Sequence, residues 1–326
     1  MNTPHPFRYI SISLQRYMLR ASLIAISVMP VLPANAIDIN FDYRFDTQGM
    51  FSDPTRRAAL EAAATVYDRF TDNLLAINPD AQNTWSLSIN RPDGGGNVTL
   101  NNLNVNAQSI TVFVGGWGFH PSVLGWAGAG NITNVSGSIA WQQTIQARGQ
   151  LGALDPNPTD YGVWGGAITF NKNVDWHFDL NTDPAENQQD FLTTAMHEIG
   201  HILGFGEAAS WGQHIQGDAE NGYTFHGQNS LDLIGHPIAL DRYGSHWAEG
   251  TYSVIDGNLQ ETAMDPSTPR GQRQWMTDLD YAGFADIGWE IPEPTVAFVF
   301  MSCSLLLLGR HRSTNTNSTI ETGDLS

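Results

Sequence analysis

The chain has 326 residues, 33 of them acidic and 15 basic, and its formal net charge is −18. Only 15% of the residues are charged, against roughly 25% in an average soluble protein, and 41% are hydrophobic. The acidic balance argues against a nucleic-acid partner, and the apolar content excludes disorder throughout. The single cysteine is Cys303, so the residues before it offer no disulfide and no thiol nucleophile.

Residues 1–36 predict a secretory signal peptide. Three arginines and no acidic residue accompany an apolar run over residues 21–32, and Ala34 and Ala36 fit an A-x-A cleavage pattern. The apolar run is too short for a membrane-spanning helix. We therefore expect an exported protein whose mature chain begins near Ile37.

Residues 291–312 have the opposite organisation. A Pro-Glu-Pro motif at residues 292–294 precedes an apolar run over residues 295–308, and a basic cluster follows. Fourteen helical residues span about 21 Å, which is short of a ~30 Å hydrocarbon core. The order of these parts resembles the PEP-CTERM sorting signal of bacterial envelopes. A polar tail, residues 313–326, follows, whereas proteins of that family usually end soon after the basic cluster.

The sorting-signal resemblance implies a partner and a location. In that family an exosortase in the membrane recognises and processes the segment, so we expect an exosortase-type processing enzyme and transient membrane contact through the C-terminal segment. The expected location is the cell envelope, outer surface or extracellular matrix of a Gram-negative-type bacterium.

Between these ends lies a single expected domain, residues 37–290, in which several short runs have the pattern of strands. Alternating or continuous apolar residues bounded by Gly, Asn or Pro are typical of strands. A Gly triplet at residues 94–96 predicts a turn. We expect strands over residues 37–43, over 109–114 ending at a Gly pair, and over 167–171 and 176–180, the last two joined by a tight turn.

Two segments have helical periodicity. Asp53 and Pro54 predict an N-cap and first helical residue, and apolar residues recur from there to Leu74, about five turns. The second helix is expected over residues 188–203, with Gly204 as its C-terminal stop.

The second helix carries the sequence His-Glu-Ile-Gly-His. His197 and His201 are four residues apart, so both imidazoles lie on one face and can bind a single ion. Glu198 is one step round the helix, where it can reach a water at the metal without ligating the ion. This pattern predicts a zinc site on a helix of an exported protein.

The run from His197 to Gly204 resembles the signature of the metzincin superfamily of zinc peptidases. That family places a third ligand three residues after the Gly, where this chain has Glu207. The resemblance implies a zinc metalloendopeptidase that hydrolyses protein or peptide substrates by metal-activated water, with Glu198 as general base.

Three residues are candidates for the third ligand. Glu207 has the expected spacing, and His214 follows seven residues later. His246 precedes a Trp and, further on, Met264, an order that looks like the leishmanolysin-type branch with its inserted segment and Met-turn. We favour His246 because neutral imidazole suits zinc, and we retain Glu207 and His214 as alternatives. Met264 would then be the Met-turn residue, packed beneath the metal without ligating it.

The metzincin resemblance also implies the fold class. We expect an α+β catalytic domain with a twisted mixed sheet packed on two long helices. An irregular C-terminal subdomain with the Met-turn and a terminal helix would follow the active-site helix. Thr277 and Asp280 predict a capping box for that terminal helix, and Gly288 its end. By analogy with the family, the strand over residues 167–171 would offer a backbone edge to a peptide substrate.

Two alternatives remain open at the level of the sequence. Asp179, Asn181, Asp183 and Glu186 are candidate calcium ligands, and the other interpretation of this segment is a solvated acidic loop. The chain could also be a non-catalytic extracellular-matrix or surface protein with a structural or vestigial zinc site. Glu198 distinguishes the two functions, because a structural site has no need of it.

Overall fold

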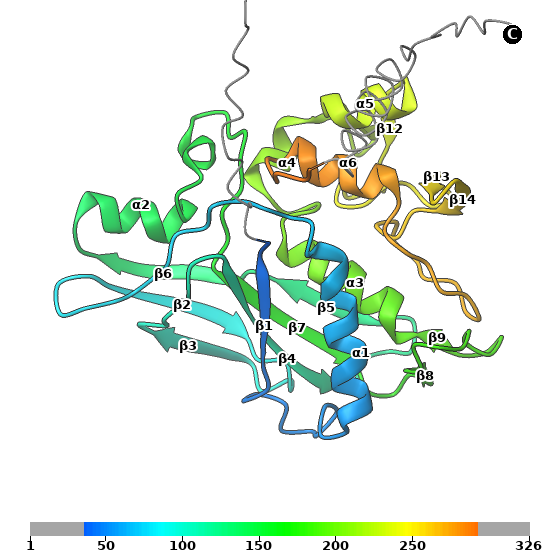
Figure 1. Cartoon of the computed structure of the whole chain (residues 1–326), viewed down its shortest axis with the longest axis horizontal. Helices are drawn as coiled ribbons and strands as arrows, with labels where there is room; N and C mark the ends of the chain where they lie inside the picture. Colours follow the sequence, from blue (N-terminus) through cyan, green and yellow to red (C-terminus); the bar gives the residue numbers. More distant parts are fainter. Residues whose placement is uncertain (1–35, 293–326) are drawn as a thin grey trace, which may run out of the picture. The chain divides into compact units, whose positions relative to one another are not determined.

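The computed structural model describes residues 36–292 (Figure 1). The expected signal peptide apart from Ala36, the sorting segment after Pro292 and the polar tail lie outside the described residues. The described part is a mixed structure of six α-helices and several sheets, which agrees with the expected α+β class. Within it, no helix combines the length and hydrophobicity needed to cross a bilayer.

A four-stranded mixed sheet forms the centre of the domain. Its strand order is β1-β4-β7-β5, in which β1, β4 and β7 are parallel and β5 is antiparallel to β7. The sheet confirms the strands expected from residues 37, 109 and 167. Its members are β1 (Asp38–Asp42), β4 (Ser109–Trp117), β7 (Gly165–Asn171) and β5 (Gly125–Gly128).

Strand β4 continues through the glycine pair that was expected to end it. Gly115 pairs with Thr169 and Gly116 with Phe170 of β7. A Cβ on Gly115 would lie 3.0 Å from the carbonyl oxygen of Phe45, and one on Gly116 2.8 Å from Met50. The two glycines therefore permit close packing against the sheet rather than a turn.

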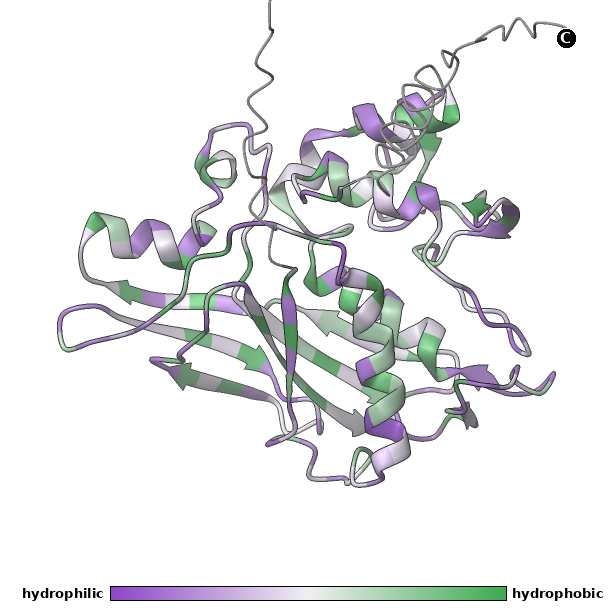
Figure 2. Ribbon diagram, viewed as in Figure 1, coloured by the Kyte–Doolittle hydropathy of each residue, from purple (hydrophilic) through white to green (hydrophobic). Residues whose placement is uncertain are grey.

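Helices α1 (Pro54–Ala64) and α3 (Phe191–Ile202) pack together against this sheet (Figure 1). Asp53 caps α1 and Pro54 opens it, as expected. Figure 2 shows hydrophobic residues along the sheet strands and along α3, and most of those that are buried belong to one large cluster. The two helices have 11 and 12 residues, about three turns each.

The expected five-turn length of the first helix is wrong. A 3₁₀ turn, η1 (Thr65–Tyr67), follows α1, and Thr65 Oγ1 donates to the carbonyl of Ala62. Phe70 and Leu74 are buried as expected, but they belong to a non-helical segment that crosses the core. Tertiary packing, and not helical periodicity, buries these two residues.

The segment between β7 and α3 also differs from the expectation. The strand expected over residues 176–180 is only β8 (Trp176–His177), and it pairs with β9 (Gln189–Asp190) instead of β7. Strand β7 has β4 on one side and β5 on the other, so it offers no free edge to a peptide. The free edge of this sheet beside α3 belongs to β5.

A second sheet and a helix cover a smaller buried cluster. Strand β2 pairs antiparallel with both of its neighbours, and the expected Gly turn at residues 94–96 joins β2 to β3. Alternate residues of β2 pack against Trp141 and Ile145. The elements are β2 (Thr84–Asn90), β3 (Asn97–Asn101), β6 (Asn131–Ser136), α2 (Ile139–Ala147) and the 3₁₀ helix η2 (Leu151–Leu154).

The chain after α3 consists of short elements and ends in the expected capped helix. Thr277 and Asp280 form the capping box, and Gly288 has φ +115° two residues past the helix. The elements are α4 (Ala209–Gln213), β10 (Ile215–Asp218), β11 (Gly222–Phe225), α5 (Gln228–Ile234), β12 (Ile238–Ala239), β13 (Tyr252–Ile255), β14 (Asn258–Glu261) and α6 (Asp278–Asp286).

A buried arginine connects backbone segments that are far apart in the sequence. Arg148, at the C-terminal cap of α2, is fully buried, and its guanidinium has no acidic partner within salt-bridge distance among the described residues. Burial lowers its pKa to about 10, so the group stays charged at neutral pH. The guanidinium donates instead to four carbonyl oxygens, those of Leu75 at 2.7 Å, Asn106 at 2.7 Å, Ser109 at 2.6 Å and Val163 at 3.1 Å.

We expect Arg148→Gln to lower the free energy of unfolding by about 3–5 kcal/mol, because it leaves several buried carbonyls without a donor. Arg148→Lys should recover part of the loss, since an ammonium reaches fewer of these oxygens. Urea unfolding of the purified variants measures both. A loss below about 1 kcal/mol for the glutamine variant would show that water replaces the guanidinium.

Candidate metal centre

Helix α3 begins at a buried side-chain cap and ends just before a glycine. Asp190 is its N-cap and accepts from Thr193, and Arg273 pairs with the same carboxylate at 2.8 Å. The helix therefore starts three residues later than expected. It ends before Gly204, whose φ of +96° and close approach to the Tyr161 ring leave no room for a side chain.

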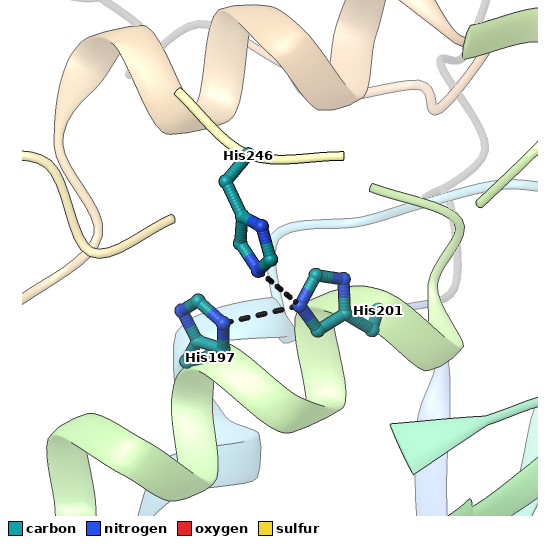
Figure 3. A group of neighbouring side chains, drawn as sticks. All are labelled: His197, His201 and His246. Carbon is teal, nitrogen blue, oxygen red and sulfur yellow. Dashed lines mark hydrogen bonds between the residues drawn. The ribbon is translucent and has the colours of Figure 1, made fainter. Parts of the chain in front are cut away.

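Three imidazoles converge beside this helix (Figure 3). Nε2 of His201 lies 3.0 Å from Nε2 of His197 and 3.0 Å from Nε2 of His246. His197 and His201 come from successive turns of α3, and His246 approaches from the loop before Trp247. Among the His, Cys, Asp and Glu residues over 36–292, this is the one group of three close enough to hold a metal ion.

The two other candidates for the third position lie elsewhere. Nε2 of His214 donates to the carbonyl of Asp286 at 2.8 Å. Glu207 is exposed and lines the same cavity as the histidines, but its carboxylate is not part of their group. The geometry therefore favours His246 over both alternatives.

The opposite nitrogen of each ring faces an oxygen acceptor. Nδ1 of His197 lies 2.8 Å from the carbonyl oxygen of Ala263, and Nδ1 of His201 lies 2.9 Å from that of Phe205. Nδ1 of His246 lies 3.3 Å from Oδ2 of Asp241. A carbonyl or carboxylate oxygen can only accept, so the proton of each neutral ring sits on Nδ1.

This tautomer leaves three Nε2 lone pairs directed at one point. Neutral imidazoles in this state cannot donate to one another, so the short Nε2–Nε2 distances are repulsive unless a cation lies between them. Second contacts of this kind, from carbonyl and carboxylate oxygens, are typical of histidines that ligate metals. The donor set therefore fits a metal ion.

Burial favours the neutral form of all three rings. It lowers the pKa of His201 to about 4, and it lowers that of His197 well below its usual value. The pKa of His246 is also lowered by burial, against the opposing effect of Asp241. The rings consequently remain neutral, with Nε2 unprotonated and available to a metal, at pH values below the ordinary range of histidine.

Glu198 lies beside the three rings without a partner. Its side chain makes no hydrogen bond with another described residue, although only 6% of the residue is exposed. Burial raises its pKa to about 8. A Cβ on Gly125 of β5 would lie 2.5 Å from Oε1 of Glu198, so this glycine makes the room that the carboxylate occupies. No pattern in the sequence indicated this role of Gly125.

Met264 packs against α3 between His197 and His201. A Cβ on Gly200 would lie 2.7 Å from Sδ of Met264, and Met264 is fully buried. The thioether therefore packs against the backbone of α3 one residue before His201, and the missing side chain of Gly200 allows this close approach.

Asp280 holds the segments that carry the site. Its Oδ1 accepts from Nε1 of Trp247 at 3.0 Å and from N of Met264 at 3.2 Å, and its Oδ2 accepts from N of Ala263 at 3.0 Å. One carboxylate of α6 thus fixes the residue after His246 and the carbonyl that orients His197. Its place in the capping box was expected, but these contacts were not, because they join distant segments.

The calcium candidates do not form a comparable group. Asp179 accepts from the backbone of Asn181 at 2.9 Å and from Oγ1 of Thr182 at 3.0 Å, as in a turn stabilised by its own side chain. Within residues 36–292, the carboxylates of Asp179, Asp183 and Glu186 do not come together as a metal-binding set.

The histidines open into a cavity of about 520 Å³ between β5 and the loop after Met264. Residues 121–127 line it, as do Pro266, Ser267, Thr268 and Arg270. Gln189, at 7% exposure, lines the same space.

Comparison with known proteins gave no match among family models, curated proteins or solved structures.

We predict that Glu198 destabilises the metal-free fold above its unfolded pKa. The folded pKa is raised, so folding loses stability as the pH rises from about 4.5 towards 8, by about 1.4 kcal/mol per unit. In metal-free protein, Glu198→Gln should therefore raise the free energy of unfolding by about 3–5 kcal/mol at pH 8 and change it little at pH 5.

Urea unfolding at the two pH values tests this, with Glu220→Gln as a control that removes an exposed carboxylate outside the cavity. An effect of Glu198→Gln that is the same at both pH values would contradict the prediction.

Proposed function

We propose that this protein is an exported zinc-dependent endopeptidase of the metzincin type. The observation that carries the proposal is the unpartnered carboxylate of Glu198 beside three inward-facing Nε2 lone pairs. The order of parts along the chain supports the same family: two histidines on α3, a later His-Trp, a buried methionine under Gly200, and a capped terminal helix.

His197, His201 and His246 would hold the ion. Three neutral imidazoles are a frequent ligand set of catalytic zinc, which keeps a further position open. A zinc ion bound there would lower the pKa of a water molecule and polarise a substrate carbonyl. The metal identity is part of the proposal, because imidazole also suits copper, iron and nickel.

The chain's own groups would position the substrate and move the proton. The free edge of β5 can pair with an extended peptide, which brings a backbone carbonyl above the three rings. Glu198 would take the proton of the attacking water on its carboxylate and pass it to the leaving amine nitrogen. The raised pKa of this carboxyl favours accepting a proton, and a nearby cation would oppose the shift.

The alternative function is a matrix or surface protein with a structural or vestigial zinc site. A structural zinc site normally has four protein ligands and no spare carboxylate. Here the group has three histidines, and Glu198 remains unpartnered at a cost in stability. Both features support the enzyme over the structural protein.

We predict that Glu198→Ala binds zinc like the wild type yet loses about 10²–10⁴-fold in the rate of casein cleavage. The reason is that the variant keeps the three imidazoles but lacks the group that moves the proton. Metal analysis gives the zinc content, and release of labelled peptides gives the rate, with a chelator as the zero-activity reference. Cleavage at the wild-type rate by the zinc-loaded variant would reject the mechanism.

A further inference from the structure

The two ends of the cavity carry opposite charges, and neither has an oppositely charged partner among the described residues. Glu207 lies at one end, and its carboxylate makes no hydrogen bond or ion pair with a described residue. Arg270 lies at the other; its guanidinium donates to the carbonyl of Asn187 and has no acidic partner within salt-bridge distance over residues 36–292.

The contacts of Arg270 place it beside Gln189. The backbone N of Gly271 donates to the carbonyl of Gln188 at 2.9 Å, which ties the two segments together. Oε1 of Gln189 is buried without a hydrogen-bond partner, although the residue lines the cavity. A buried amide oxygen of this kind is costly unless a ligand supplies a donor. This end of the cavity therefore offers a cation and an unused acceptor.

The Glu207 end continues into a second hollow. A cavity of about 410 Å³ shares Trp126, Ala127 and Glu207 with the first, and it extends to Tyr161 and Asn131. Trp126 is 47% exposed, so its ring forms an accessible apolar surface there. A long side chain with a cationic tip can lie on such a ring and reach the carboxylate.

Strand β5 gives the cleft a direction. It runs from Gly125, paired with Phe170, to Gly128, paired with Ala167. Gly125 lies at the Gln189 end of the cleft. Its partner Phe170 is followed in β7 by Asn171, whose carbonyl oxygen accepts from the indole of Trp176, and Trp176 pairs with Gln189. Antiparallel pairing is slightly more stable per residue than parallel pairing. A peptide added antiparallel to β5 thus runs from Glu207 towards Arg270.

We propose that the site selects peptides with a cationic side chain on the N-terminal side of the scissile bond and an acidic side chain on the C-terminal side. Glu207 would bind the cation and Arg270 the carboxylate, while Gln189 accepts from a peptide N–H. The inference rests on the proposed function for the position of the scissile bond. Glu207, Gln189 and Arg270 act in it as specificity residues and take no part in the chemistry.

Binding measured without cleavage tests the charge order. Two labelled peptides of identical composition are compared. The first has Arg before and Glu after a central apolar pair, and the second has Glu before and Arg after it. The zinc-loaded full chain with Glu198→Gln should bind the first about tenfold more tightly in fluorescence anisotropy at low salt. The difference should shrink at high salt, because these charges are partly exposed.

Two further substitutions, each combined with Glu198→Gln, assign the preference to residues. Each of the variants Glu207→Gln and Arg270→Gln should reduce the ratio of the two dissociation constants about threefold. Glu207→Gln would weaken binding of the peptide's arginine, and Arg270→Gln would weaken binding of the peptide's glutamate. Arg44→Gln is the matched control, since Arg44 is exposed, pairs with Asp42 and lies outside the cavity. This control should leave the ratio unchanged.

The outcomes separate the two proposals. Equal affinity for both peptides, no binding of either, preference for the reverse order, or a ratio unaffected by Glu207→Gln and Arg270→Gln would overturn the inference. Cleavage is scored apart, with the wild-type chain and mass spectrometry of the products. Selective binding without any cleavage would reject the endopeptidase and leave the charge order standing.

Discussion

The arrangement of the site depends on the three Nδ1 protons. Each is held by an acceptor outside the group, the carbonyls of Ala263 and Phe205 and the carboxylate of Asp241. Once these protons are fixed, the opposite nitrogens can only present lone pairs to one another, about 3 Å apart. A fold gains nothing from such repulsion, so the natural reason for it is a cation. The proposed ligand set, tautomers and function all follow from this constraint.

The acceptors come from three different parts of the chain, which explains why the C-terminal half is built as it is. The turn at Gly204 returns the carbonyl of Phe205 to His201. Asp280 of α6 fixes Ala263 and Trp247, and thereby two of the three imidazoles. Short elements with little regular structure can hold a site of this kind when one buried carboxylate is shared among them.

The sequence predicted the parts of the site that lie on one element. His197, Glu198 and His201 share a helix with a clear period and a glycine stop, and the α6 capping box is a local pattern. His246 could only be placed among alternatives, because its distance from α3 is set by tertiary structure. No sequence pattern indicated the roles of Gly125, Asp241 and Gln189, since each matters through a contact with a distant segment. Likewise Phe70 and Leu74 repeat at helical spacing, but the core buries them outside any helix.

The most direct test of the account is zinc K-edge X-ray absorption on the full chain, with metal analysis of the same sample. We expect one zinc per chain with three imidazole nitrogens among its ligands. The variant His246→Ala should remove one imidazole from the spectrum, whereas Glu207→Gln should leave the spectrum unchanged. Protein that purifies without metal and takes up none, or a spectrum with two imidazoles that responds to Glu207→Gln and not to His246→Ala, would contradict the central claim.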